Sequence, residues 1–151
     1  MREEPGSEGA APPKSALDGI SASMPALAAG LEMQERAAAL GYDWPDVAGV
    51  LDKVAEELAE LAEAATPAER QEEFGDILLV VTNVGRKLGI ESEAALRAAN
   101  TKFRERFRRV ERMVAERGVA MRDLDFATLD ELWDAAKVEE RLAVAGRERS
   151  T

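Results

Sequence analysis

The stretch TPAE at residues 66–69 constrains the fold of this chain more than any other feature of its sequence. A threonine, a proline at the first helical position and a glutamate three residues after the threonine form a capping box, which marks the start of a helix. Just before it, Val54, Leu58 and Leu61 recur at helical spacing. Two helices joined by so short a turn must lie antiparallel and adjacent, so the centre of the chain is predicted to be a helical hairpin.

The remainder of the chain repeats the helical pattern. Apolar residues recur every three or four positions, and glycines that can end a helix follow several of these segments. No segment alternates between apolar and polar residues as a strand would. The fold class is therefore predicted to be all-α, a bundle of four to five helices assembled as a dimer. The predicted helices cover residues 25–40, 46–65, 67–88, 92–117 and 128–143.

Two of these helices carry more specific signals. The fourth repeats apolar residues at heptad spacing in two series, and a bundle this short would struggle to cover such apolar stripes within one subunit. These series are Leu96, Phe103, Val110 and Ala99, Phe107, Val114. The last helix is predicted to start with a second capping box, formed by Thr128 and Glu131.

Composition excludes several kinds of site. The 151 residues carry a formal net charge of −10 with a pI near 4.7, which disfavours a surface that binds nucleic acid or an anionic membrane. The chain has no cysteine and no histidine, which excludes disulfides, thiolate nucleophiles, Ser-His-Asp triads and nearly every zinc site. It has no apolar run of membrane-spanning length, and its first residues lack the apolar segment that is typical of a signal peptide. We predict a cytoplasmic protein whose chemistry uses carboxylates, amines, hydroxyls or a metal ion held by oxygen.

The composition and the apolar pattern of the sequence predict three segments. Residues 1–23 are rich in glycine, proline, serine and alanine without apolar periodicity, which indicates a flexible leader. We expect residues 24–145 to form the helical domain and residues 146–151 to form a flexible tail.

The second predicted helix divides its acidic residues between two faces. With Leu58 directed at the core, Glu57 and Glu60 lie together on one flank of the apolar stripe, and Glu56 and Glu63 lie on the other.

The third helix carries the matching acids. With Phe74 directed inward, Glu73 and Asp76 face the first acidic pair, and Asn83 follows two turns later on the same side. Four converging carboxylates repel one another unless a cation neutralises them. A hard divalent ion such as Mg²⁺, which prefers oxygen ligands, suits this group.

Alternatives to a metal site exist for these acids. Glutamate is common on solvated amphipathic helices, and the first acidic segment alone favours that interpretation. The second segment favours a site, because Gly75 lies inside a helix where it costs about 1 kcal/mol relative to alanine, and a glycine there suits the approach of another group to the backbone. A di-iron carboxylate bundle is excluded, since its Glu-x-x-His motifs need histidine.

Ordered blocks over residues 24–138 closely resemble the MazG nucleoside triphosphate pyrophosphohydrolases. The blocks are MQERAAALGYDWPDV, KVAEELAEL, RQEEFGDILLVVTNVGRKLGI, ALRAANTKFRERFRRVERMVAERG and ELWDAAK. The signature of the family is E-E-x-x-E, a spacer and E-x-x-D. The chain looks most like the second module of the two-module members.

The resemblance implies roles for individual residues. Glu57, Glu60, Glu73 and Asp76 match the magnesium ligands, with Mn²⁺ as a substitute ion. Glu56 matches the first acid of the motif, and Glu56 and Glu57 are the candidate catalytic residues. The candidate substrate-binding residues are Lys53, Asn83, Lys102, Arg106, Trp133 and Lys137.

The substrate contacts have plain alternatives as well. Lys102 and Arg106 lie one helical turn apart and can reach phosphate from one face, but a solvated face of a charged helix gives the same pattern. Trp133, one turn before Lys137, can stack on a nucleobase or pack in the core.

The function implied by the resemblance is Mg²⁺-dependent hydrolysis of nucleoside triphosphates to the monophosphate and pyrophosphate, with broad specificity, by a homodimer. Two alternatives stay open. One is a narrow dUTP or dCTP pyrophosphatase on the same scaffold, and the other is a non-catalytic helical dimerisation module.

Overall fold

The computed structural model describes residues 14–148, so most of the predicted leader and the last three residues of the predicted tail lie outside the described residues. The described part contains five α-helices, one 3-10 helix and no strand, which confirms the all-α prediction. The chain folds as two units, Met1–Glu93 and Ala94–Thr151. The predicted dimer and the predicted domain boundaries stay predictions.

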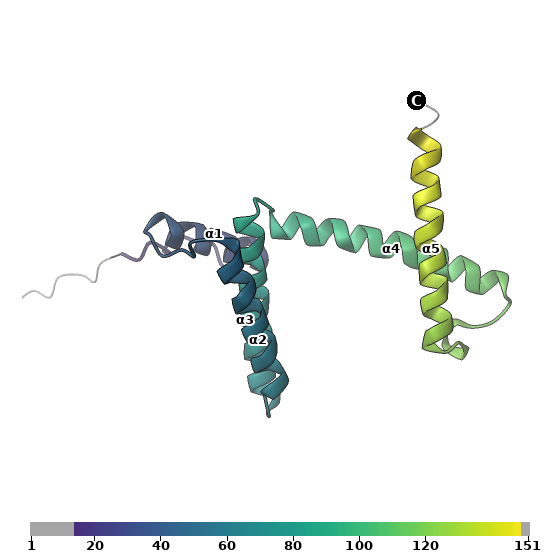
Figure 1. Ribbon diagram of the computed structural model, residues 1–151, viewed down its shortest axis with the longest axis horizontal. Coiled ribbons are helices and arrows are strands. Elements are labelled where there is room, and N and C mark those ends of the chain that lie inside the picture. Colours follow the sequence, from purple (N-terminus) through teal and green to yellow (C-terminus); the bar gives the residue numbers. More distant parts are fainter. Residues whose placement is uncertain (1–13, 149–151) are drawn as a thin grey trace, which may run out of the picture. The chain divides into compact units, whose positions relative to one another are not determined.

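The first unit contains three helices, α1 (Ala26–Ala39), α2 (Val47–Glu63) and α3 (Pro67–Lys87). Helices α2 and α3 lie side by side and antiparallel, as the short turn between them requires (Figure 1). Helix α1 packs on α3, where the Gln34 side chain donates from Nε2 to the Leu79 carbonyl oxygen at 2.8 Å. A Cβ atom at Gly30 would lie 3.3 Å from Leu79 Cδ1, so the glycine allows this close approach.

The helix ends follow the signals in the sequence. Thr66 accepts from the Glu69 amide, and the Glu69 carboxylate accepts from the Thr66 amide, so the predicted capping box at the start of α3 is present. Asp46 caps α2 through the Gly49 amide. Gly41, Gly89 and Gly118 have positive φ angles at the ends of α1, α3 and α4, as predicted.

The second unit contains most of α4 (Ser92–Glu116), a 3-10 turn (Met121–Asp123) and α5 (Phe126–Glu148), and α5 crosses α4 (Figure 1). The buried side chains at this crossing are Val110, Val114, Leu132 and Ala136. Two ion pairs join the helices beside them, Arg106 with Glu140 and Arg112 with Glu139, each at 2.6 Å. The second unit is therefore held by a small apolar core with charged pairs beside it.

Two predictions about the second unit are wrong. The last helix does not start at a capping box of Thr128 and Glu131, because Asp125 caps it instead by accepting from the Thr128 amide at 2.8 Å. The helix then continues to Glu148, beyond the predicted end at residue 143. The heptad stripe of α4, in contrast, is buried at Val110 and Val114 while Leu96 and Phe103 are 49% and 56% exposed, as expected of a stripe that one subunit cannot fully cover.

Candidate functional site

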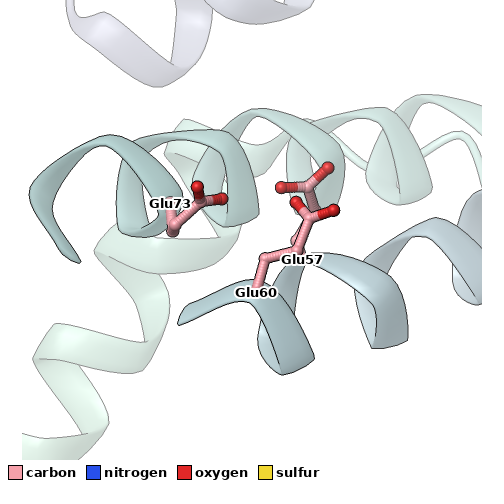
Figure 2. A group of neighbouring side chains, drawn as sticks. All are labelled: Glu57, Glu60 and Glu73. Carbon is pink, nitrogen blue, oxygen red and sulfur yellow. The ribbon is translucent and has the colours of Figure 1, made fainter. Parts of the chain in front are cut away.

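The α2–α3 hairpin brings acidic residues from both helices together. One carboxylate oxygen each from Glu57, Glu60 and Glu73 lies within 4.8 Å of the other two. Figure 2 shows Glu57 and Glu60 rising from α2 and Glu73 leaving α3 toward the space between the helices. The antiparallel register set by the turn at residues 64–66 is what places these acids opposite each other. Three of the four predicted metal ligands therefore converge.

Glu57 is the most unusual member of this group. It is only 4% exposed, and its Oε2 atom is buried without a hydrogen-bond partner among the described residues. A buried carboxylate oxygen without a partner is costly, because its hydration is lost and nothing replaces it. Its other oxygen accepts from Lys53 Nζ at 2.6 Å. Glu57 thus keeps one oxygen available to a further cationic or hydrogen-bonding group.

The electrostatics of Glu73 show the repulsion within the group. Partial burial raises the pKa of this carboxyl, and the nearby charges of Glu60, Glu57 and Asp76 raise it further. A divalent cation removes this repulsion when it binds. Ligands 2.1 Å from an octahedral ion lie about 3.0–4.2 Å apart, so small rotations of these side chains would suffice. The three residues present fit a hard divalent ion held by oxygen.

Asp76 and Glu56 stand slightly apart from the group of three. Asp76 is exposed on α3 and acts on Glu73 through its charge. Glu56 is exposed on α2 and accepts from Lys53 Nζ at 2.9 Å, so one lysine bridges Glu56 and Glu57. Lys53, a predicted substrate contact, is therefore engaged with both candidate catalytic carboxylates.

The prediction that Leu58 and Phe74 point into the core is wrong. Leu58 and Phe74 are 52% and 54% exposed, whereas the buried residues of α2 are Val50 and Glu57. In this chain Glu57 itself faces α3, because the pair of helices closes around the acidic side instead of around Leu58 and Phe74. The space beside Gly75 is open, with no described atom within 4 Å of the position of a Cβ.

Three of the four predicted contacts in the second unit already have partners. Arg106 Nε donates to Glu140 at 2.6 Å, and Lys137 Nζ donates to Asp134 at 2.8 Å. Trp133 is half-buried against the core, with its ring centroid 5.1 Å from that of Phe103. Lys102 is exposed on α4. These residues lie in a different unit from the carboxylates.

The structure adds residues that the sequence did not single out. In the first unit, Asn83 lines a pocket of about 310 Å³ together with Gln34, Tyr42, Asp43, Trp44 and Arg86. Arg86 and Lys87 bind the Asp43 carboxylate, and these hydrogen bonds lower the pKa of Asp43 to about 2. The only sequence signal for this pocket was the aromatic pair in the loop GYDWP, since Gln34 lies on a helix with no distinctive motif.

Curated relatives decide the family of the chain. A nucleoside triphosphate pyrophosphohydrolase/pyrophosphatase MazG from Thermotoga maritima is 44% identical over 114 residues, which cover 76% of this chain and 45% of the relative. A nucleoside triphosphate pyrophosphohydrolase from Escherichia coli K12 is 44% identical over 131 residues, covering 83% of this chain and 50% of the relative. This chain is a MazG homologue.

The MazG homology has a limited extent. The chain spans about half the length of these two relatives. A shorter match, 46% identity over 69 residues, relates 46% of the chain to 14% of the uncharacterized protein YabN from Bacillus subtilis. No family model matches the sequence. Among residues 14–148, no helix combines the length and apolar character needed to cross a membrane.

Proposed function

We propose that this chain hydrolyses nucleoside triphosphates to a nucleoside monophosphate and pyrophosphate. The observation that carries the proposal is the group of three carboxylates, Glu57, Glu60 and Glu73, with a buried, unpartnered oxygen on Glu57. The chain is 44% identical to two proteins that are named for this activity, and this similarity supports the proposed reaction.

A divalent cation is part of this proposal. Glu57, Glu60 and Glu73 would hold Mg²⁺, or Mn²⁺ in its place, with Asp76 as a fourth ligand from the next turn of α3. When bound, the ion supplies Lewis-acid stabilisation of phosphoryl charge and lowers the pKa of a bound water. An acidic site and a polyanionic substrate attract each other only through such a cation.

The carboxylates of this site would also handle the proton of the reaction. Water attacks the α-phosphorus, the bond from that phosphorus to the bridging oxygen breaks, and pyrophosphate leaves with the bonding pair. The attacking water gives its proton to a carboxylate, for which Glu56 and Glu57 are the candidates. Both carboxylates accept from Lys53 Nζ, through one oxygen each. Lys53 would orient the Glu57 carboxylate and offset part of its charge.

We propose further substrate contacts within the second unit. Lys102 is exposed and Arg106 shares its face of α4, so both suit phosphate binding once Arg106 exchanges Glu140 for substrate. Trp133 lines an apolar pocket of about 290 Å³ with Phe103 and Phe107, which leaves part of the indole available for stacking. Lys137 follows Trp133 by one turn. We also propose a homodimer and keep the prediction of a cytoplasmic location.

The experiment is a pyrophosphate-release assay with a panel of nucleoside triphosphates at equal concentration. Wild-type protein with Mg²⁺ is expected to turn over several nucleotides, and Glu60→Gln is expected to lower kcat by about 100-fold or more, because a metal ligand is lost while size is kept. Glu63→Gln, one turn along α2 and outside the carboxylate group, is the matched control and should be nearly silent.

Three other results of this assay would contradict parts of the proposal. Turnover of dUTP or dCTP alone would establish the narrow alternative. No release from any nucleotide would establish the non-catalytic module. Activity of Glu60→Gln within a few-fold of wild type would remove the carboxylates from the site.

A further inference from the structure

We propose that the pocket between α1, the loop at residues 41–45 and the C-terminal half of α3 binds the edge of the nucleobase. This inference rests on the proposed function and adds specificity-determining residues to it. The pocket of about 310 Å³ is at the small end of the range for small-molecule sites, which suits one base with part of its sugar. Its polar lining consists of Gln34 from α1, Asn83 and Arg86 from α3, and Tyr42 and Asp43 from the loop, with Arg86 and Asp43 bound to each other.

Gln34 presents an acceptor that nothing in the described chain satisfies. Its Nε2 donates to the Leu79 carbonyl oxygen at 2.8 Å, which fixes the orientation of the amide. Its Oε1 is buried and has no hydrogen-bond partner among residues 14–148. A buried amide oxygen without a donor is unfavourable, so a ligand that brings an N–H group to it gains that hydrogen bond at little competing cost. Every nucleobase carries such a group on its edge.

Asn83 supplies the complementary donor. Its Oδ1 accepts from Arg86 Nε at 2.8 Å, which leaves Nδ2 directed away from that bond and without an acceptor in the part of the chain that the structure describes. Arg86 also forms an ion pair with Asp43, so the group that binds the Asn83 amide is itself restrained. An acceptor at Gln34 and a donor at Asn83 match the adjacent donor and acceptor atoms on the edge of a base.

Aromatic residues form the wall of the same pocket. Tyr42 and Trp44 are 86% and 42% exposed, on either side of Asp43 in the loop. Lys87 Nζ donates to Asp43 and to the Trp44 carbonyl oxygen, so the loop is held against α3. Trp44 rests on Gly49 at the start of α2, where a Cβ atom would lie 2.9 Å from the indole. An aromatic wall held in place offers a stacking surface for a flat ring at low cost in entropy.

The position of the pocket relative to the carboxylates fits one nucleotide. Asn83 follows Asp76 by seven residues on α3, which is within about 20° of two full turns and about 10 Å along the axis. The two residues therefore share a face of the same helix. A nucleotide whose α-phosphate lies at the carboxylates would carry its base, one ribose away, toward Asn83 and Gln34.

The test separates base recognition from phosphate binding. Gln34→Leu and Asn83→Leu are expected to raise KM for nucleoside triphosphates by about fivefold or more with kcat nearly unchanged, because a base contact acts on ground state and transition state alike. Inhibition by magnesium tripolyphosphate, which has no base, should not change in either variant. Glu35→Leu, the exposed neighbour of Gln34 on α1, is the matched control and should keep the wild-type KM. Unchanged KM in both pocket variants, or an equal loss toward tripolyphosphate, would overturn the inference.

A second measurement does not depend on turnover. The chain has two tryptophans, so its amide NMR spectrum contains two indole N–H signals, which Trp44→Phe assigns. Millimolar uridine or adenosine is expected to shift the Trp44 signal in wild-type protein and not in Gln34→Leu, and inorganic phosphate should leave it in place. A nucleoside that shifts only the Trp133 signal, or neither, would overturn the inference. If uridine or adenosine binds here while no triphosphate is hydrolysed, the proposed function fails and the base pocket stands.

Discussion

At the scale of single residues, charged groups in this chain serve two different purposes. Three carboxylates lie together in the first unit, those of Glu57, Glu60 and Glu73. Within this group Lys53 forms an ion pair only with Glu57. Asp43, by contrast, is saturated by Arg86 and Lys87. The first arrangement raises the pKa of Glu73, whereas the second lowers the pKa of Asp43 and stabilises the fold.

Asp43 gives a prediction about pH. Hydrogen bonds from Arg86 and Lys87 lower its pKa from 3.8 to about 2 in the folded chain. A carboxyl whose pKa is lower in the folded state stabilises the protein above its unfolded pKa, and this stabilisation is lost as the pH falls through the folded pKa. Wild-type protein is therefore expected to be more stable than Asp43→Asn at pH 6, with the difference shrinking between about pH 4 and pH 2.

Urea denaturation of both proteins at several pH values measures this difference. Asp52→Asn is the control, because Asp52 is exposed on α2 and its carboxylate makes no hydrogen bond or ion pair in the described chain. A stability difference for Asp43→Asn that stays constant from pH 6 to pH 2 would contradict the proposed anchoring of the loop.

Trp133 gives a second prediction at this scale. Trp133→Ala removes a stacking surface and is expected to weaken nucleotide binding by roughly 1–3 kcal/mol, unevenly among the bases. Trp133→Phe keeps packing against Phe103 and should lose less. Titration calorimetry with several nucleotides, with thermal unfolding measured alongside, tests this. Unchanged binding together with a large loss of stability would make the indole a core residue only.

At the scale of helices, the turn between α2 and α3 determines the site, because it sets which acids face one another. Thr66→Ala removes one half of the capping box seen at Thr66 and Glu69. It is expected to lower the free energy of unfolding by about 1 kcal/mol. Thr101→Ala is the control, since Thr101 lies on the exposed face inside α4, where alanine is the better helix former. Chemical denaturation of the two variants measures the effect, and equal stabilities would contradict the role of the cap.

Much of the helical architecture was predictable, and the errors have physical causes. Helices α1 to α4 end within about two residues of their predicted limits, because Asp46, Thr66 and the glycines at 41, 89 and 118 act locally. The start of α5 was missed because Asp125 and Thr128 are both good N-caps, three residues apart, and the sequence does not rank them.

The site was predictable in part for a related reason. Helical spacing and the turn together bring Glu57, Glu60 and Glu73 to one place. The burial of Glu57 instead of Leu58 was not predictable, because apolar periodicity assumes that an apolar stripe is covered within the same chain. The pocket around Gln34 depends on contacts between α1, a loop and α3, and spacing along one helix carries no information about such contacts.

At the scale of the whole molecule, each unit leaves large apolar side chains exposed. Leu58 and Phe74 are about half exposed on α2 and α3, and Phe126 is 81% exposed on α5. Exposed apolar surface of this kind favours association, and a homodimer with the same patch on both subunits is the simplest arrangement. Sedimentation at micromolar concentration is expected to show a dimer.

The dimer prediction has a matched pair of variants. Phe74→Glu places a charge on the exposed apolar stripe and is expected to shift the protein toward monomer. Gln71→Glu adds the same charge at an exposed polar position on α3 and should leave the dimer intact. Wild-type protein that sediments only as a monomer would contradict the prediction.

The most direct test of the whole account identifies the first products of hydrolysis. Wild-type protein, Mg²⁺ and adenosine triphosphate can be followed by phosphorus NMR, in which each phosphorus of substrate and product has its own signal. Hydrolysis at the α-phosphorus predicts adenosine monophosphate and pyrophosphate in equal amounts from the first time point, with the rate abolished in Glu60→Gln. Adenosine diphosphate and orthophosphate as the first products would contradict the account.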